Sequence, residues 1–282
     1  MRRVRGAMAV GGAVAAYILI ARPRHLRWGA TDTEANEAVP GDDLTAIFTG
    51  TLPGSRRKPR CCCRGRWEQA MRRVRGAMAV GGTVAAYVLI ARPRQLSWGA
   101  TDRECEEPLP GDDLITIADL TATRVITIHA SADEIWPWIA QLGQGRGGFY
   151  SYDFLENLVG CEIQSSDRIV PEWQYIGVGD EVRFAPEVGL AVASVEQGRS
   201  LVLRGGIPIG STAPPYDFTW AFVLRDERHR TTRLLVRERY AYTRPWARLI
   251  VEPTEMLSFA MSQKMLRGIK GRAERTVALR YE

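Results

Sequence analysis

Residues 1–44 recur almost unchanged at residues 71–114, at an offset of 70 positions. The first ten residues of the two copies are identical, and 35 of the 44 aligned positions match. Repeat architectures stack several units of about 20–50 residues against one another. Here only two copies occur, and a dissimilar insert separates them. The pattern therefore indicates a tandem duplication or an over-extended start, and it leaves a single stretch of the chain to form a globular domain.

The duplication divides the 282 residues into four parts. Residues 1–48 are the first copy, residues 49–70 an Arg/Cys-rich linker that we predict to be disordered, and residues 71–114 the second copy with a connector. Pro93, Pro108, Pro110 and Gly111 predict that this connector is extended. Residues 115–282 are long enough for one domain with a sizeable core. Because the second copy runs directly into this domain, we interpret Met71 as the ancestral start. Residues 1–70 then add a second membrane helix or nothing.

The net charge of +6 comes mainly from arginine, and six basic residues crowd the linker. Nucleic-acid binding is one interpretation of such a run. No motif that reads bases accompanies the charge, so we favour an unstructured basic linker beside a membrane and expect no nucleic-acid partner. The six residues are Arg56, Arg57, Lys58, Arg60, Arg64 and Arg66.

The cysteines do not form a metal-binding or disulfide pattern. Residues 61–63 are three adjacent cysteines without the two-residue gap that lets a pair chelate zinc, and Cys105 and Cys161 stand alone. The three histidines, His25, His129 and His229, form no cluster with them. An odd number of cysteines also argues against a secreted disulfide scaffold. We therefore expect no metal.

Each copy contains a run of 16 uncharged residues, at residues 6–21 and 76–91, with arginines on both sides. A helix of this length spans about 24 Å, somewhat less than the ~30 Å hydrocarbon core of a bilayer. Flanking arginine stems can snorkel and the bilayer can thin, so we predict a single- or double-pass membrane protein. A signal sequence and a soluble helix are the alternatives, and the sequence does not assign the side of the globular domain.

The domain is predicted to begin with a strand at residues 120–129 and two short helices. Ser131 and Glu134 have the spacing of a capping box at the first helix, and Pro137 is placed in its first turn because proline lacks a backbone donor. The second helix covers residues 153–159. Alternating segments then predict strands at residues 181–184, 190–196, 200–205, 218–225 and 230–240.

A long C-terminal helix is predicted at residues 244–275. Its expected apolar face consists of Trp246, Leu249, Ile250, Pro253, Met256, Leu257, Ala260 and Met261. Arg244, Arg248, Glu255 and Ser262 lie on the opposite face, whereas Val251 and Phe259 break the pattern. The fold class is therefore α+β, with an antiparallel sheet, two short helices and a long C-terminal helix, preceded by the two duplicated apolar helices.

Several segments carry a resemblance to a known superfamily: EIWPWIAQLGQGRGGFYSYDFLENLVG, DRIVPEWQ, VGDEVRFAPEVG, PYDFTWAFVL and VRERYAYTRPWARLIVEP. With this order of elements, the chain resembles the START-like, or SRPBCC, superfamily with its helix-grip fold. More narrowly, it is similar to membrane-anchored actinobacterial members. The resemblance covers about residues 120–275 and implies a curved sheet that grips the long helix around a cavity. It implies a fold and no particular activity, because the superfamily includes lipid carriers, receptors and cyclases.

The leading hypothesis is a membrane-anchored domain that binds a small hydrophobic molecule, such as a lipid or polyketide-like compound. Ligand sites of this kind are mostly apolar with a few convergent polar groups. For any one of these residues, a place in a filled core is the simpler interpretation. The candidate lining residues are Trp138, Tyr150, Tyr152, Arg204, Phe218, Trp220, Phe222, Glu238, Tyr240, Leu257 and Met261.

An enzyme is the alternative, although the sequence favours a protein without catalytic activity. Strand alternation places Glu238 and Tyr240 on one face, where a buried pair could act as acid and base in a cyclase or dehydratase. The simpler interpretation, which we favour, is an exposed strand with cross-strand ion pairs. The run GQGRGG at residues 143–148 matches a dinucleotide signature but follows a helix. We interpret it as a flexible rim and expect no cofactor.

A third hypothesis is an interaction module at the membrane surface. Basic residues gather at the end of the long helix, where they complement the helix dipole and could also contact anionic lipid. These residues are Lys264, Arg267, Lys270, Arg272 and Arg275.

Overall fold

A computed structural model describes residues 85–158, 160–206 and 213–281, together with seven positions between 71 and 82. The first apolar run, residues 6–21, and the linker at residues 49–70 lie outside the described residues. The described positions from 71 to 86 are helical, and a π-helical turn, η1 (Tyr87–Ala91), follows them. Within the described residues, no helix has both the length and the apolar character needed to cross a bilayer.

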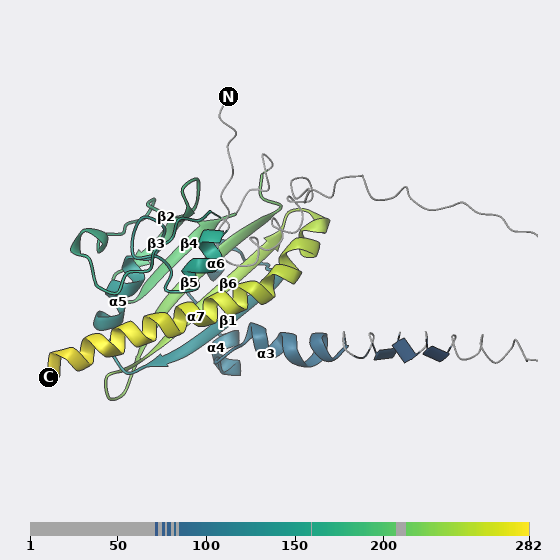
Figure 1. Cartoon of the computed structure of the whole chain (residues 1–282), viewed down its shortest axis with the longest axis horizontal. Coiled ribbons are helices and arrows are strands. Elements are labelled where there is room, and N and C mark those ends of the chain that lie inside the picture. The colour runs from purple at the N-terminus through teal and green to yellow at the C-terminus, as the bar shows by residue number, and fades with distance from the viewer. Residues whose placement is uncertain are drawn as a thin grey trace, which may run out of the picture. The chain divides into compact units, whose positions relative to one another are not determined.

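Six strands form one curved antiparallel sheet, as Figure 1 shows. The strands are β1 (Leu120–Ile128), β2 (Glu181–Ala185), β3 (Val188–Glu196), β4 (Ser200–Gly205), β5 (Tyr216–Glu227) and β6 (Thr231–Tyr242). Their order is β1-β6-β5-β4-β3-β2, so the last five follow one another and β1 pairs with β6 at one edge. The predicted strands and the α+β class are thus confirmed.

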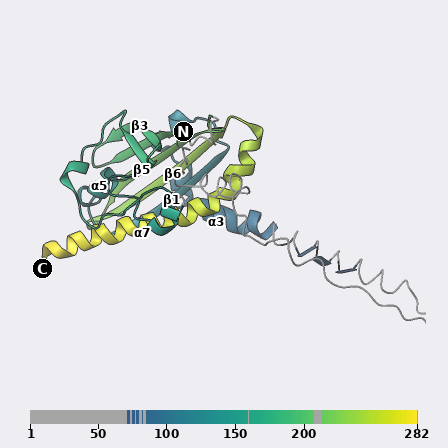
Figure 2. The same ribbon diagram turned by 45° about the horizontal axis from the view of Figure 1, so that its top comes forward.

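The helices also follow the predicted order. They are α5 (Ala132–Ala140), α6 (Asp153–Leu158) and α7 (Arg248–Tyr281), with short turns at η3 (Pro171–Trp173) and η4 (Pro245–Ala247). Helix α7 runs along one face of the sheet in both Figure 1 and Figure 2 and contacts α5 and β1. We call this the inner face. A sheet whose inner face packs on one long helix is the arrangement expected from the sequence.

Strand β5 is buried on both faces, because apolar side chains cover each of them. On the inner face, Phe218, Trp220 and Phe222 belong to the main core together with residues of α5 and α7. On the outer face, a smaller cluster forms from Leu109, Val125, Val223 and Leu235. The residues before β1 therefore cover the outer face of the sheet.

The connector before β1 folds into short helices and is not extended as predicted. It contains α3 (Arg92–Leu96), α4 (Asp102–Glu106) and the turn η2 (Asp112–Leu114). Gly99, between α3 and α4, has a φ of 73°, and a Cβ there would lie 2.1 Å from the Val125 carbonyl oxygen. The Val125 N–H donates to the Trp98 carbonyl over 2.9 Å. This close approach to β1 requires glycine.

Arg237 fastens the connector to the outer face. Its buried guanidinium donates to the carbonyl oxygens of Glu104 (2.6 Å), Cys105 (3.0 Å) and Glu107 (2.9 Å), and pairs with Asp112 (2.6 Å). The interpretation of β6 as an exposed strand with cross-strand ion pairs is therefore wrong. The arginines do alternate with Glu238 and Tyr240, but the connector and α7 bury the two sides.

Helix α5 begins after the predicted capping box, in which the Glu134 carboxylate accepts from the backbone N–H (2.9 Å) and hydroxyl (3.0 Å) of Ser131. Pro137 lies at the sixth helical residue and not in the first turn. The helix has only nine residues, so the missing N–H removes a single bond from a short ladder.

The predicted apolar face of α7 is wrong in its first half. Trp246 in η4, and Leu249 and Met256 in α7, are exposed. Met261 is buried as predicted, and the other buried positions in this half are Val251, Thr254, Glu255, Ser258 and Ser262. Helical periodicity cannot reveal this, because the polar face of the helix is buried against polar groups of the sheet.

The glycine run at residues 143–148 forms a closed loop after α5. Gly143 and Gly148 exchange two backbone hydrogen bonds of 3.0 Å. The guanidinium of Arg146 donates to the carbonyl oxygens of Ala140 (3.0 Å) and Tyr175 (3.1 Å). These contacts fasten the loop on both sides, in contrast to the flexible rim that was predicted.

Candidate functional site

Glu238 of β6 lies at the centre of a buried polar cluster between the inner face and α7. Antiparallel pairing places it opposite Ala122 of β1 and Trp220 of β5. Opposite residues of an antiparallel pair share a face, so these three side chains stand in one row on the inner face. Alternation places Arg124 of β1 and Tyr240 of β6 on the same face.

Four side chains donate hydrogen bonds to the Glu238 carboxylate. They are Arg124 Nη1 (2.8 Å), Ser258 Oγ (3.0 Å), Ser262 Oγ (3.1 Å) and the Tyr240 hydroxyl (3.2 Å). The two serines come from α7 and stand four residues apart, one helical turn. A carboxylate with four donors is fully satisfied, so Glu238 is a fixed anchor between sheet and helix.

Glu255 of α7 is the second carboxyl of the cluster. It contacts Arg124 Nη2 on one side and the Gln95 amide of α3 on the other. Burial raises the pKa of Glu255 to about 7, and the nearby Arg124 guanidinium limits that rise. Near neutral pH this carboxyl therefore exists in both protonation states, which is the condition under which a group exchanges protons most readily.

Arg124 carries the only cationic group that the described structure places in this cluster, and its side chain is 0% exposed. Its guanidinium also lies 5.7 Å from the ring centroid of Phe259. One guanidinium therefore faces two carboxyls. Buried ion pairs of this kind add little net stability, and apolar residues of the same volume are often as stable. The cluster is therefore not explained by stability alone.

Three buried side-chain donors on the inner face have no hydrogen-bond partner among the described residues. Arg124 Nε and the indole Nε1 of Trp220 lie on the central part of this face, and the third, the Tyr242 hydroxyl, lies near the end of β6. A buried donor without a partner costs about 1–3 kcal/mol. Trp220 is also part of an aromatic group, with its ring 4.7 Å from Phe222, 5.6 Å from Phe184 and 6.0 Å from Phe149. Unused donors thus stand beside an apolar aromatic wall.

The other aromatic candidates have structural contacts. The Tyr150 hydroxyl donates to the Trp138 carbonyl (3.1 Å) and accepts from Gln141 (2.9 Å), and Arg272 stacks 4.6 Å from its ring. Phe218 packs on Tyr240 with ring centroids 4.6 Å apart. Trp138 is buried beside Tyr150, and its indole nitrogen has no partner among the described residues.

The remaining candidates lie on α7 or at the surface. Arg204 is exposed and pairs with Asp217 over 2.7 Å. Tyr152 is also exposed and lies under Lys264 of α7. Met261 is buried and Leu257 half-buried on α7. The structure therefore brings Glu238, Tyr240, Trp220 and Phe222 together and leaves Arg204 and Tyr152 outside the group.

Sequence reasoning missed Arg124, Glu255, Ser258 and Ser262. A signal existed for Arg124, because it is a charged residue within the apolar stripe of the first predicted strand. Glu255 and the serines gave none, since the face that carries them looks like an ordinary solvated helix face. Only the position of the sheet shows that this face is buried.

A further buried carboxyl, outside this cluster, lies in α6. Glu156 is 3% exposed, and neither of its oxygens has a hydrogen-bond partner among the described residues. Burial raises its pKa to about 8, and the neighbouring Asp153 adds to the rise. Glu156 is therefore mainly protonated at neutral pH and carries no charge that needs a partner.

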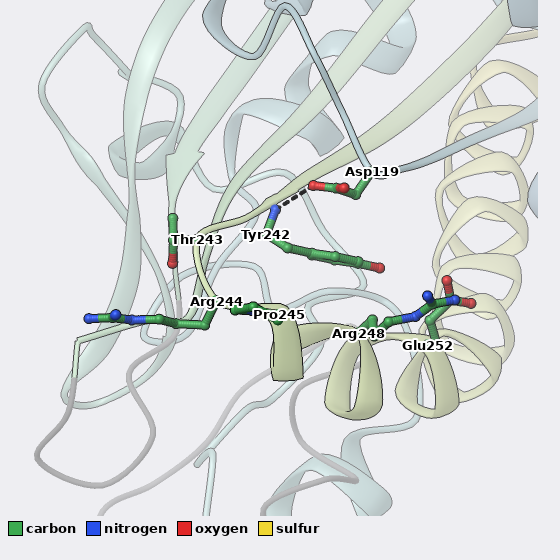
Figure 3. Close-up of a pocket in the computed structure, with 7 residues that line it drawn as sticks. All are labelled: Asp119, Tyr242, Thr243, Arg244, Pro245, Arg248 and Glu252. Carbon is green, nitrogen blue, oxygen red and sulfur yellow. Dashed lines mark hydrogen bonds between the residues drawn. The ribbon is translucent and has the colours of Figure 1, made fainter.

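A surface pocket of about 630 Å³ opens where β6 ends and α7 begins. Figure 3 shows its lining residues, Asp119, Tyr242, Thr243, Arg244, Pro245, Arg248 and Glu252. A second pocket of about 680 Å³ lies between residues 108–110, the start of α5 and the β3–β4 turn. Neither of these two pockets is lined by Glu238, Trp220 or Phe222. In the described part of the chain, no group of three or more potential ligands could hold a metal ion.

No family model and no curated protein matches this chain. Among solved structures it is similar to the hypothetical protein jhp0584 from Helicobacter pylori (13% identity, TM-score 0.37), over 59% of this chain and 95% of that one. Norcoclaurine synthase from Thalictrum flavum shows 14% identity and a TM-score of 0.33, over 59% of this chain and 92% of that one. CalU16 from Micromonospora echinospora shows 19% identity and a TM-score of 0.27, over 57% and 88%. Similarities this weak do not establish a shared function.

Proposed function

We propose that this chain is a START-like ligand-binding protein whose site lies on the inner face of the sheet under α7. The proposed ligand is a small, largely apolar molecule that carries a hydrogen-bond acceptor, such as a carbonyl or ether oxygen. The observation that carries the proposal is the pair of unused donors, Arg124 Nε and Trp220 Nε1, beside the aromatic wall. Apolar walls with a few converging polar groups are typical of small-molecule sites.

The contacts of α7 support this location. Between Glu255 and Ser262 the helix meets the sheet through hydrogen bonds to Arg124 and Glu238. Water can replace such bonds at little cost, whereas an apolar contact cannot be opened without exposing apolar surface. A ligand that enters here would meet the unused donors of Arg124 and Trp220, while Glu238 keeps the donors that satisfy it.

Membrane attachment is the second part of the proposal. It is supported by the uncharged run at residues 76–91 and by the arginines that flank it. A tethered domain would meet apolar ligands where they are most concentrated, in the lipid phase.

The test uses the full chain extracted in detergent. Native mass spectrometry should detect a retained small molecule, and a fluorescent apolar probe should bind saturably. Trp220→Phe removes the indole donor and keeps the ring, so we expect the probe affinity to fall several-fold. Trp246→Phe, at an exposed position, is the matched control and should leave affinity unchanged. Non-saturable probe binding, equal in both variants and without any retained molecule, would contradict the proposal.

One observation favours an enzyme as the second candidate. Glu255, whose pKa is raised to about 7, contacts the same Arg124 guanidinium as Glu238. Glu238 in turn accepts a hydrogen bond from the Tyr240 hydroxyl. Glu255 could therefore transfer a proton to or from a bound molecule. If chemistry occurs, Glu255→Gln should abolish turnover and retain binding. Binding without any change of the retained molecule would support the ligand carrier instead.

A further inference from the structure

Large apolar side chains are exposed where α7 begins. Trp246 in η4 is 44% exposed, Leu249 is 73% exposed and Met256 is 55% exposed. Leu249 and Met256 stand seven residues apart, two helical turns, and therefore lie on the same side of α7. Large apolar side chains that are exposed together and flanked by polar residues are typical of a contact surface.

Two arginines accompany these side chains. Arg244 and Arg248 line the pocket in Figure 3, and in the described structure neither forms an ion pair. The acidic residues of the pocket are already engaged: Glu252 pairs with Arg92 over 2.7 Å, and Asp119 accepts from the Tyr242 N–H over 2.7 Å. The guanidinium groups are therefore available to an anion from outside.

The basic residues at the other end of α7 differ in this respect. Arg267 stacks over Trp98, Lys270 donates to the Thr127 carbonyl (2.8 Å), and Arg272 pairs with Asp167 (2.8 Å). Lys264 lies over the ring of Tyr152. The basic residues that the sequence analysis assigned to the lipid surface are therefore mostly held by contacts within the domain. The basic groups at the start of the helix, Arg244 and Arg248, form no ion pair in the described structure.

The start of α7 also lies beside the point where the apolar run enters the domain. Arg92, the first residue of α3, directly follows residue 91, the last of that run. Its side chain binds Glu252 of α7, and Gln95 of the same short helix binds Glu255. If residues 76–91 lie in a bilayer, α3 holds the start of α7 close to the bilayer surface.

We propose that Trp246, Leu249 and Met256, together with Arg244 and Arg248, dock on a bilayer that contains anionic lipid. We call these five residues the docking surface. Tryptophan is enriched at the boundary between headgroups and acyl chains, and each arginine near an anionic surface strengthens binding about fivefold. The proposal deepens the membrane part of the proposed function by naming the surface and the lipid charge that it meets, and it is independent of ligand binding.

The test is hydrogen–deuterium exchange of the full chain with vesicles of phosphatidylcholine alone or mixed with phosphatidylglycerol. Residues 244–250 lie before α7 and in its first turn, where backbone N–H groups lack an acceptor within the helix, so we expect their exchange to be fast enough to measure. We expect their exchange to slow several-fold with the mixed vesicles and much less with phosphatidylcholine alone. The loop at residues 172–180 also exposes apolar side chains, Tyr175 and Val178, and should not change.

Two variants and a control distinguish the contributions of charge and of apolar side chains to docking from an effect on folding. Arg244→Gln with Arg248→Gln should lose the dependence on phosphatidylglycerol, and Leu249→Glu with Met256→Glu should lose protection with both vesicles. Arg183→Gln with Arg199→Gln makes the same change of net charge at exposed positions elsewhere and should behave as the parent chain. All variants change exposed side chains, so their thermal unfolding should match that of the parent.

Three results would overturn the proposal. Protection of residues 76–91 without protection of residues 244–250 would show a tether without docking. Absence of protection in both segments would exclude a bilayer as the partner. Slow exchange of residues 244–250 before vesicles are added would show that the chain itself or a second copy already covers the surface. Loss of probe binding with docking intact would count against the proposed ligand site alone.

Discussion

At the scale of single residues, Arg124 determines whether the two carboxyls of the inner cluster can remain buried. It pairs with both Glu238 and Glu255 and has no exposure to solvent. Removing one partner of a buried ion pair is costly, because the charge left behind has lost its water and its counter-ion. A single substitution in the cluster should therefore cost more stability than the small net contribution of the intact cluster suggests.

Arg124→Met should lower the free energy of unfolding by about 3–5 kcal/mol, measured by urea denaturation, because two buried carboxyls lose their cation. Adding Glu238→Gln and Glu255→Gln to this variant should recover most of the loss. A triple variant no more stable than Arg124→Met alone would show that the loss comes from packing and not from charge.

The raised pKa values of Glu156 and Glu255 make stability depend on pH. In the folded state these carboxyls keep their protons up to about pH 8 and about pH 7, whereas in the unfolded chain they lose them near pH 4.5. Between these values the folded state binds more protons, so stability falls as pH rises. We expect the melting temperature to fall from pH 5 to pH 8 and to change little above it.

Glu156→Gln should flatten much of this fall, because the neutral amide has no proton to lose. Glu156 alone can lower the free energy of unfolding by at most about 5 kcal/mol as the pH rises from 4.5 to about 8. Asp167→Asn, at a largely exposed carboxylate, is the control and should leave the profile unchanged in shape. Parallel profiles for the parent and Glu156→Gln would contradict a buried, protonated Glu156.

At the scale of elements, α7 shows how far the sequence predicts this fold. Its length and place follow from composition, and the strands follow from alternation between turn residues. Its orientation does not, because Glu255, Ser258 and Ser262 resemble a solvated face until the sheet supplies Arg124 and Glu238 as partners. Amphipathic periodicity assumes an apolar interior, and it fails where the interior is polar.

The short helices of the connector could not be predicted from the sequence for a similar reason. Its prolines and glycines predicted extended chain, but local sequence does not show that Arg237 would hold three of its carbonyl groups on the outer face. These contacts make the connector part of the domain, and Gly99 allows its close approach to β1.

Arg237→Ala should therefore release the connector. With three carbonyl groups left without their donor, we expect faster hydrogen exchange in residues 98–116 and a loss of about 3 kcal/mol or more in stability. Arg225→Ala removes a half-exposed arginine whose ion pair, in the described part of the chain, is with Glu107, and its effect should stay within about 1 kcal/mol. Equal effects of the two substitutions would contradict the role given to Arg237.

At the scale of the whole molecule, the duplicated segment is distinct from the folded domain, and it contains the run that we propose as an anchor. The contacts described above all lie between residues 92 and 281: the connector covers the outer face, α7 covers the inner face, and α3 joins the two through Arg92 and Gln95. The second copy of the repeat supplies the connector, which runs directly into β1.

The chain that begins at Met71 should therefore fold and localise as the full chain does. We expect Met71–Glu282 and the full chain to have melting temperatures within about 2 °C of one another, because every contact that joins the connector, the sheet and α7 is kept. The membrane fraction should hold both chains, since residues 76–91 remain. A double-pass arrangement predicts otherwise: loss of the first run would move the domain to the other side of the membrane, which protease protection in sealed vesicles detects. Unchanged protection would assign the anchoring to the second run alone.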